Sequence, residues 1–138
     1  MKRIFTFLGI VFAFVACTVS PQKIEYGKDM CSYCDMAIVE KTHAAQYVTE
    51  KGRAYKFDAI ECMINDINDK PELKLAYTLV TDYTQPTTLV DASSSVFLIS
   101  EEIKSPMGAN LSAFSNSNAI TQTGPQFNWK EIKMHFKK

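Results

Sequence analysis

Short apolar stretches separated by polar turns predict a small β-meander in the first half of the chain. Strands are predicted at residues 36–40 (MAIVE), 44–50 (AAQYVTE) and 54–57 (AYKF). The polar segments KTH and KGR lie between them and supply the turns. This region is therefore expected to form three consecutive strands.

The spacing of apolar residues changes to a helical period after the third strand. The apolar stripe of this segment consists of Phe57, Ile60, Ile64 and Ile67. Asp58 stands at an N-cap position, and Glu61 follows three residues later, as in a capping box. Pro71 ends the pattern because proline cannot continue a helix. The sequence predicts a helix over residues 58–68.

The second half repeats this outline with further strands. They are predicted at residues 75–83, 87–93, 95–100 and 111–115. Pro106 and Gly108 mark a turn that carries Met107 before the last of them. Residues 128–138 predict a short amphipathic helix with basic residues near its C-terminal end. Each half has a methionine-bearing turn before a strand, which indicates an α+β fold of two similar units packed as one domain.

The beginning of the chain reads as an export signal. Lys2 and Arg3 precede an uncharged apolar run over residues 4–16, which is too short for a comfortable membrane span. The run ends in FVAC, which resembles the lipobox of bacterial lipoproteins, where cleavage precedes a cysteine that becomes lipidated. Lipidation of Cys17 is therefore predicted. The alternative is a plain signal peptide that leaves Cys17 as a free thiol.

Three segments follow from this interpretation. Residues 1–16 are the signal peptide, residues 17–29 are the lipidated cysteine with a polar tether, and residues 30–138 are the folded domain. The protein is thus expected to lie outside the cytoplasm, anchored to a bacterial membrane by its lipid.

Composition and charge exclude several classes of function. Of the 138 residues, 46% are hydrophobic, which is enough for one core. The 15 basic and 15 acidic residues are spread along the chain, so no basic stripe predicts a nucleic-acid partner. The sequence also contains no Ser-His-Asp order and no glycine-rich phosphate loop. We therefore expect a binding protein rather than an enzyme.

The most distinctive motif is C-x-x-C-x-M in the segment MCSYCDM, residues 30–36. The two-residue spacer lets Cys31 and Cys34 turn their sulfurs toward one point, and Met36 lies two residues beyond Cys34 on the same face of the predicted strand. Two thiolates and a thioether form a soft ligand set, which selects Cu(I) over Mg, Ca and Mn. Methionine is not among the usual zinc ligands, so the motif favours Cu(I).

Met107 is a further candidate ligand from the second half of the chain. Its turn between Pro106 and Gly108 leaves little room to bury a long apolar side chain locally, so its exposure calls for a reason. A neutral thioether on such a turn can reach a soft ion without adding charge. Packing of Met107 between the two units is the alternative.

Three other interpretations of the cysteines stay open. A structural zinc module needs more ligands, for which His43 and Cys62 are the additional candidates. An extracytoplasmic thiol-disulfide oxidoreductase could use Cys31 and Cys34, although such a site usually begins a helix. A structural disulfide between these two cysteines is the third interpretation. Lipidation of Cys17 would leave an odd number of cysteines, which favours a metal or a reactive thiol.

Together FVAC, MCSYCDM, KFDAIECMI and SPMGANLSAF closely resemble the NosL family of copper-binding lipoproteins. These proteins accompany nitrous oxide reductase in denitrification and are thought to supply Cu(I) to its copper-sulfide centre in the periplasm. The resemblance implies that Cys31, Cys34, Met36 and Met107 bind Cu(I). It implies nitrous oxide reductase and other copper-supply proteins as partners, and a membrane as the site of anchoring.

The resemblance also implies a fold of two ββαβ-type units. One segment departs from the family pattern, because residues 116–126 read NSNAITQTGPQ where many members have a longer alanine-rich helix. This polar segment weakens the expectation of a long helix in the second unit.

Overall fold

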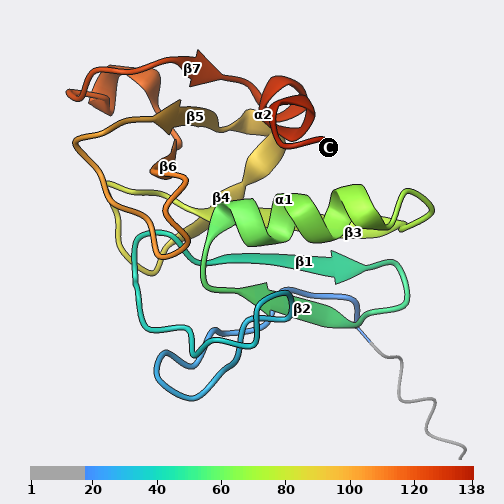
Figure 1. Ribbon diagram of the computed structural model, residues 1–138. Coiled ribbons are helices and arrows are strands. Elements are labelled where there is room, and N and C mark those ends of the chain that lie inside the picture. Colours follow the sequence, from blue (N-terminus) through green and yellow to red (C-terminus); the bar gives the residue numbers. More distant parts are fainter. Residues whose placement is uncertain (1–17) are drawn as a thin grey trace, which may run out of the picture.

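Two antiparallel sheets lie one above the other in the computed structural model, which describes residues 18–138 (Figure 1). The first sheet has the strand order β2-β1-β3-β4 and the second has the order β6-β5-β7. The strands are β1 (Ala45–Thr49), β2 (Ala54–Phe57), β3 (Leu75–Thr81), β4 (Leu89–Asp91), β5 (Val96–Ile99), β6 (Leu111–Phe114) and β7 (Gln126–Phe127). The helices are α1 (Ile60–Asp69) and α2 (Trp129–His135), with 3₁₀ turns η1 (Ala92–Ser94) and η2 (Ser117–Ala119).

The two units share one topology, which confirms the predicted α+β fold. In the first unit, β1 pairs with both β2 and β3, and α1 connects β2 to β3. In the second unit, β5 pairs with both β6 and β7, and only the short turn η2 stands in the helix position. The polar segment between β6 and β7 ends at Gly124, where an added Cβ would lie 2.1 Å from the Ile99 carbonyl oxygen. The connection therefore passes close to β5 without a packed helix.

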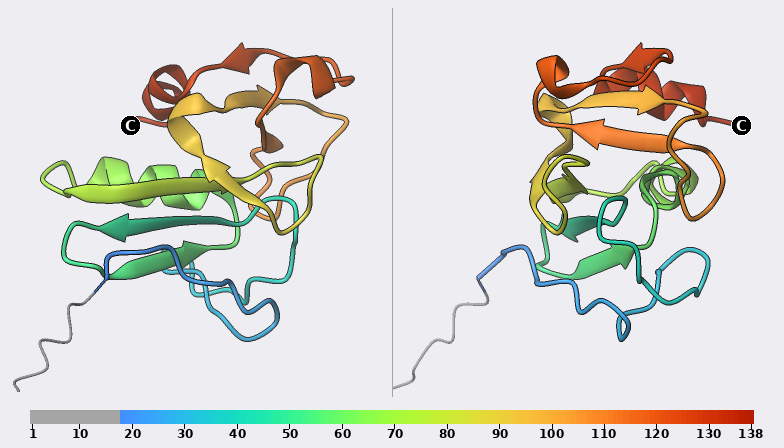
Figure 2. Two further views of the ribbon diagram at one scale, coloured as in Figure 1. Left: turned by 180° about the vertical axis from the view of Figure 1, so that it is seen from behind. Right: turned by 90° about the vertical axis from the view of Figure 1, so that its left-hand side faces the viewer.

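The larger hydrophobic cluster joins the two units. It contains Phe57, Ile60 and Ile64 from the first unit and Phe97, Leu111 and Ile132 from the second. Helix α1 packs against β1 and β2 and also contacts β6 of the second sheet. Both turned views show the first sheet below and the second sheet with α2 above (Figure 2). Because apolar surface of both units is buried in common, the units form one domain.

Residues 36–40 do not form the strand predicted from the sequence. Their β-pairing is limited to an isolated bridge between Ala37 and Met30, and their other backbone bonds join the preceding loop. Asp35 has a φ of 60°, a left-handed conformation that turns the chain back on itself just before this segment. The predicted strand over residues 87–93 is also shorter, because Asp91 accepts a hydrogen bond from the Ser93 backbone and starts η1.

The predicted capping box of α1 is wrong, although the helix itself is confirmed. Its N-cap is Ala59, and no side chain caps it. Asp58 and Glu61 have the right spacing for a box, but both carboxylates have partners elsewhere in the fold. A capping box does occur at α2, between Asn128 and Glu131.

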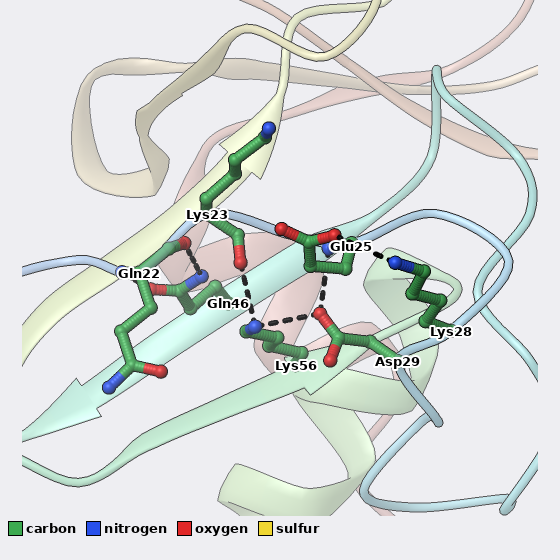
Figure 3. A network of polar contacts seen from close by, with 7 residues as sticks. All are labelled: Gln22, Lys23, Glu25, Lys28, Asp29, Gln46 and Lys56. Atoms are coloured by element: carbon green, nitrogen blue, oxygen red, sulfur yellow. Dashed lines mark hydrogen bonds and ion pairs between the residues drawn. The ribbon is translucent and has the colours of Figure 1, made fainter.

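Part of the segment predicted as a tether belongs to the folded domain. Ile24 is buried in the core. The Gln22 backbone N–H donates to Gln46 Oε1 at 2.7 Å, and Gln46 Nε2 donates back to the Gln22 carbonyl oxygen at 2.6 Å (Figure 3). Lys56 Nζ pairs with Asp29 Oδ2 at 2.7 Å in the same network. These bonds fasten residues 22–29 to β1 and β2, because each joins this segment to a strand residue.

The predicted signal peptide and the lipidation site Cys17 lie outside the described residues. Within residues 18–138, no helix combines the length and the apolar character needed to cross a membrane.

Candidate metal centre

Three cysteines and one aspartate converge beside the N-terminal end of α1. The sulfurs of Cys31, Cys34 and Cys62 and a carboxylate oxygen of Asp58 all lie within 4.8 Å of one another. Cys31, Cys62 and Asp58 are buried, whereas Cys34 is partly exposed, and the three thiols are free. Four possible donor atoms therefore lie close together, and Cys34 is the member that reaches the surface.

Backbone hydrogen bonds shape the C-x-x-C loop. The Cys31 N–H donates to the Met36 carbonyl oxygen at 2.8 Å, and the Asp35 N–H donates to the Cys31 carbonyl oxygen at 3.0 Å. A third bond, from the Ser32 N–H to the Lys56 carbonyl oxygen at 2.8 Å, fixes the loop to β2. Since β2 leads directly into α1, this bond brings the loop against the helix start.

The sulfur of Cys31 is a strong hydrogen-bond acceptor. The Cys62 thiol donates to it and, together with the backbone N–H groups of Cys34, Asp58 and Tyr33, lowers the pKa of Cys31 to about 6 against the opposing effect of burial. The same bond to Cys31, with burial, raises the pKa of Cys62. Burial raises the pKa of Cys34 to about 11. Cys31 is thus the thiol of the centre that ionises most readily.

The remaining two donors come from the start of α1. Asp58 precedes the helix and Cys62 lies in its first turn, four residues later, so both side chains reach the same side. The Cys34 sulfur donates to Asp58 Oδ1 at 3.6 Å. The positive end of the helix dipole favours thiolate there.

Sequence reasoning proposed Cys62 only as an additional ligand and missed Asp58. The D-x-x-x-C spacing at a helix start is the signal that could have identified the pair, because two donor residue types recur one helical turn apart.

The two candidate thioether ligands lie at the surface. Met36 follows the C-x-x-C loop and is 54% exposed, and Met107 is 43% exposed on its turn. The participation of both methionines in metal binding stays a prediction.

His43 is placed apart from the converging donors. It is buried, with Nδ1 at 2.9 Å from Thr42 Oγ1 and Nε2 at 3.2 Å from Ser112 Oγ. Burial lowers the pKa of its imidazole. Both ring nitrogens already have hydroxyl partners, so the structure gives His43 a packing environment.

Comparison with known proteins gives a family and a fold. The model of the NosL family matches residues 21–124. No curated protein matches the chain. The crystal structure of the copper chaperone NosL from Shewanella denitrificans has a TM-score of 0.71 and 18% sequence identity, and the match covers 83% of this chain and 96% of that chain. At this identity, the likeness to the solved structure shows a shared fold.

Proposed function

The chain belongs to the NosL family, and we propose that it binds Cu(I) outside the cytoplasm and supplies it for assembly of the copper-sulfide centre of nitrous oxide reductase. The observation that carries this proposal is the convergence of three free thiols at the C-x-x-C-x-M loop. Thiolates and thioethers are soft donors that suit Cu(I) and disfavour Mg, Ca and Mn. Copper is the cargo of such a protein and not its resident cofactor.

The arrangement of the donors suits a protein that both takes up and releases an ion. Cys31 supplies a thiolate in advance, since its pKa is lowered to about 6. Cys34 is partly exposed, and the thioethers of Met36 and Met107 lie at the surface. A thioether carries no charge and needs no deprotonation, so it can exchange an ion without a proton. We infer that copper enters and leaves at Cys34, the partly exposed member of the centre.

The burial of the cysteines disfavours the oxidoreductase alternative. Attack on a disulfide needs an accessible thiolate. Here the thiol with the lowered pKa, Cys31, is fully buried, and the accessible Cys34 has a pKa raised to about 11. A catalytic thiol needs both a lowered pKa and access to its substrate, and here Cys31 has the first and Cys34 the second.

Asp58 favours a second candidate function, a structural zinc site. Three cysteines and one carboxylate supply four donors, all of types that bind Zn²⁺, which is the number that a tetrahedral structural site needs. Cu(I) would use the sulfurs, whereas Zn²⁺ would also use the oxygen. The two functions therefore differ in their dependence on Asp58.

Substitution of Met36 tests the carrier against the oxidoreductase. Met36→Ser is expected to weaken Cu(I) retention about tenfold or more, because a soft donor is lost. Thiol-disulfide exchange at Cys31 and Cys34 should not change. Cu(I) retention is measured by competition with a chelator, and exchange is measured with a model disulfide.

Met134→Ser is the matched control for this experiment. Met134 is 64% exposed on α2 and lines a separate groove that contains no residue of the C-x-x-C loop. Unchanged copper retention in Met36→Ser, with rapid reduction of the model disulfide by wild type, would favour the oxidoreductase.

Anchoring is tested at Cys17. Cys17→Ser should abolish lipidation, because the acyl chains attach through the cysteine sulfur, and should move the protein from the detergent-extracted membrane fraction to the soluble fraction. The fractions are compared by immunoblot, with Cys62→Ser as a control that leaves the signal intact. Equal membrane retention of Cys17→Ser and wild type would contradict the lipoprotein assignment.

A further inference from the structure

Glu61 is a carboxylate buried beside the cysteines of the candidate metal centre. It lies in the first turn of α1, next to Cys62, and is only 3% exposed. Its Oε2 atom is buried and has no hydrogen-bond partner among the described residues. Burying a carboxylate without full pairing is unfavourable, and an apolar side chain of similar size is often at least as stable. A glutamate at this position therefore suggests a task that an apolar side chain could not perform.

The other oxygen of Glu61 holds the turn that carries Met107. Glu61 Oε1 accepts a hydrogen bond from Ser105 Oγ at 2.8 Å and another from the Ala109 N–H at 3.3 Å. These two donors lie two residues before and two residues after Met107. One carboxylate oxygen therefore fixes both ends of the turn.

Bonds within the turn make it a single stiff unit. The Gly108 N–H donates to the Ser105 carbonyl oxygen at 3.1 Å, and the Asn110 N–H donates to Ser105 Oγ at 2.9 Å. Gly108 and Asn110 have φ values of 81° and 55°, left-handed conformations that allow the chain to reverse. Met107 stands at the tip of this unit, partly exposed. Its backbone is thus held by Glu61 while its thioether stays accessible.

We propose that Glu61 is a positioning residue for Met107, which it holds toward the centre formed by Cys31, Cys34 and Cys62. The first turn of α1 then carries two residues of the site. Cys62 supplies a thiol, and Glu61 holds the turn that presents Met107 from the second unit. This inference rests on the proposed binding of Cu(I). It explains why a carboxylate is buried beside Cys62, since a carboxylate oxygen can accept both bonds from the turn.

The test compares two substitutions of Glu61 with Met107→Leu in the full chain. Glu61→Ala removes the acceptor and should weaken Cu(I) retention about tenfold, as Met107→Leu should. Glu61→Gln keeps an acceptor oxygen without the charge and should retain affinity close to wild type. The double variant Glu61→Ala with Met107→Leu should be no weaker than either single variant, because both remove the same interaction.

A spectroscopic measurement separates positioning from general stability. In protein labelled at the methionine methyl carbons, the Met107 resonance should shift on addition of Cu(I) in wild type and Glu61→Gln, and should stay unshifted in Glu61→Ala. Ser105→Ala removes one donor of the clamp and is expected to reduce the shift. Thermal unfolding shows whether Glu61→Ala folds. If it does not, the Met107 shift in Ser105→Ala is compared with the shift in wild type instead.

Each result supports or overturns the inference. Wild-type affinity and a normal Met107 shift in Glu61→Ala would overturn it, as would equal losses in Glu61→Gln and Glu61→Ala, which would assign the effect to charge. Unchanged affinity in Met107→Leu would remove Met107 from the site and overturn the inference while leaving the proposed function intact. A wild-type protein that retains no Cu(I) would overturn the proposed function itself.

Discussion

Cys62→Ser is expected to weaken Cu(I) retention by about a hundredfold or more, since removing an outer-shell partner of a ligand already costs 10–100-fold. The centre loses one of its three sulfur donors. It also loses the thiol that donates to Cys31 and lowers the pKa of that residue to about 6. The serine hydroxyl can also donate to Cys31, so the rise in the pKa of Cys31 is expected in Cys62→Ala, which leaves no side-chain donor at this position.

Two measurements check this prediction. Chelator competition gives the loss of Cu(I) retention, and a titration followed by thiolate ultraviolet absorbance gives the pKa of Cys31. Cys62→Ala is the control, because it removes the sulfur without placing a hydroxyl group in a buried position. Both variants should lose copper to a similar extent. Wild-type retention in both would exclude Cys62 from the site.

The local sequence predicted the elements whose hydrophobic pattern agrees with their tertiary environment. The stripe of Phe57, Ile60 and Ile64 predicted α1, because the same three side chains enter the core. The strand predicted at residues 36–40 failed because its backbone bonds close the loop around Cys31 and do not join a sheet. An apolar run alone does not show which backbone partner a segment will find.

Local spacing can indicate each pair of donors, but it cannot show that the two pairs meet. Cys31 and Cys34 share one loop, so their convergence follows from the two-residue spacer. Asp58 and Cys62 join them only because Ser32 bonds to the Lys56 carbonyl oxygen and brings the loop to the helix start. No local pattern indicates a bond between residues 24 positions apart.

The failed capping box shows how tertiary contacts displaced a local preference. An N-cap side chain contributes about 1 kcal/mol, and a buried polar group left without a partner costs about 1–3 kcal/mol. Asp58 accepts from Cys34, which is partly exposed, and Glu61 accepts from Ser105, which would otherwise be buried without an acceptor. Two acids that resemble a structural signal at the sequence level thus belong to the neighbourhood of the metal centre.

Asp58 should separate the two metals that the centre could bind. Cu(I) is soft and prefers sulfur, whereas Zn²⁺ accepts carboxylate oxygen as a fourth ligand. The negative charge of Asp58 also raises the pKa of the thiols of Cys34 and Cys62, although burial has the larger effect on Cys34 and the bond to Cys31 the larger effect on Cys62. Removing that charge lowers both pKa values and makes the thiolates that Cu(I) requires easier to form.

Asp58→Asn is therefore expected to weaken Zn²⁺ binding about tenfold or more and to leave Cu(I) binding equal or slightly tighter. Each metal is titrated separately into reduced protein against a competing chelator. Asp66→Asn is the matched control, because Asp66 is another buried aspartate of α1, bonded to Tyr47 and Lys70 and not part of the centre. It should lower the free energy of unfolding without changing the preference between the metals. Equal losses of Cu(I) and Zn²⁺ in Asp58→Asn would mean that the carboxylate supports both ions, and unchanged Zn²⁺ binding would remove Asp58 from the ligand set.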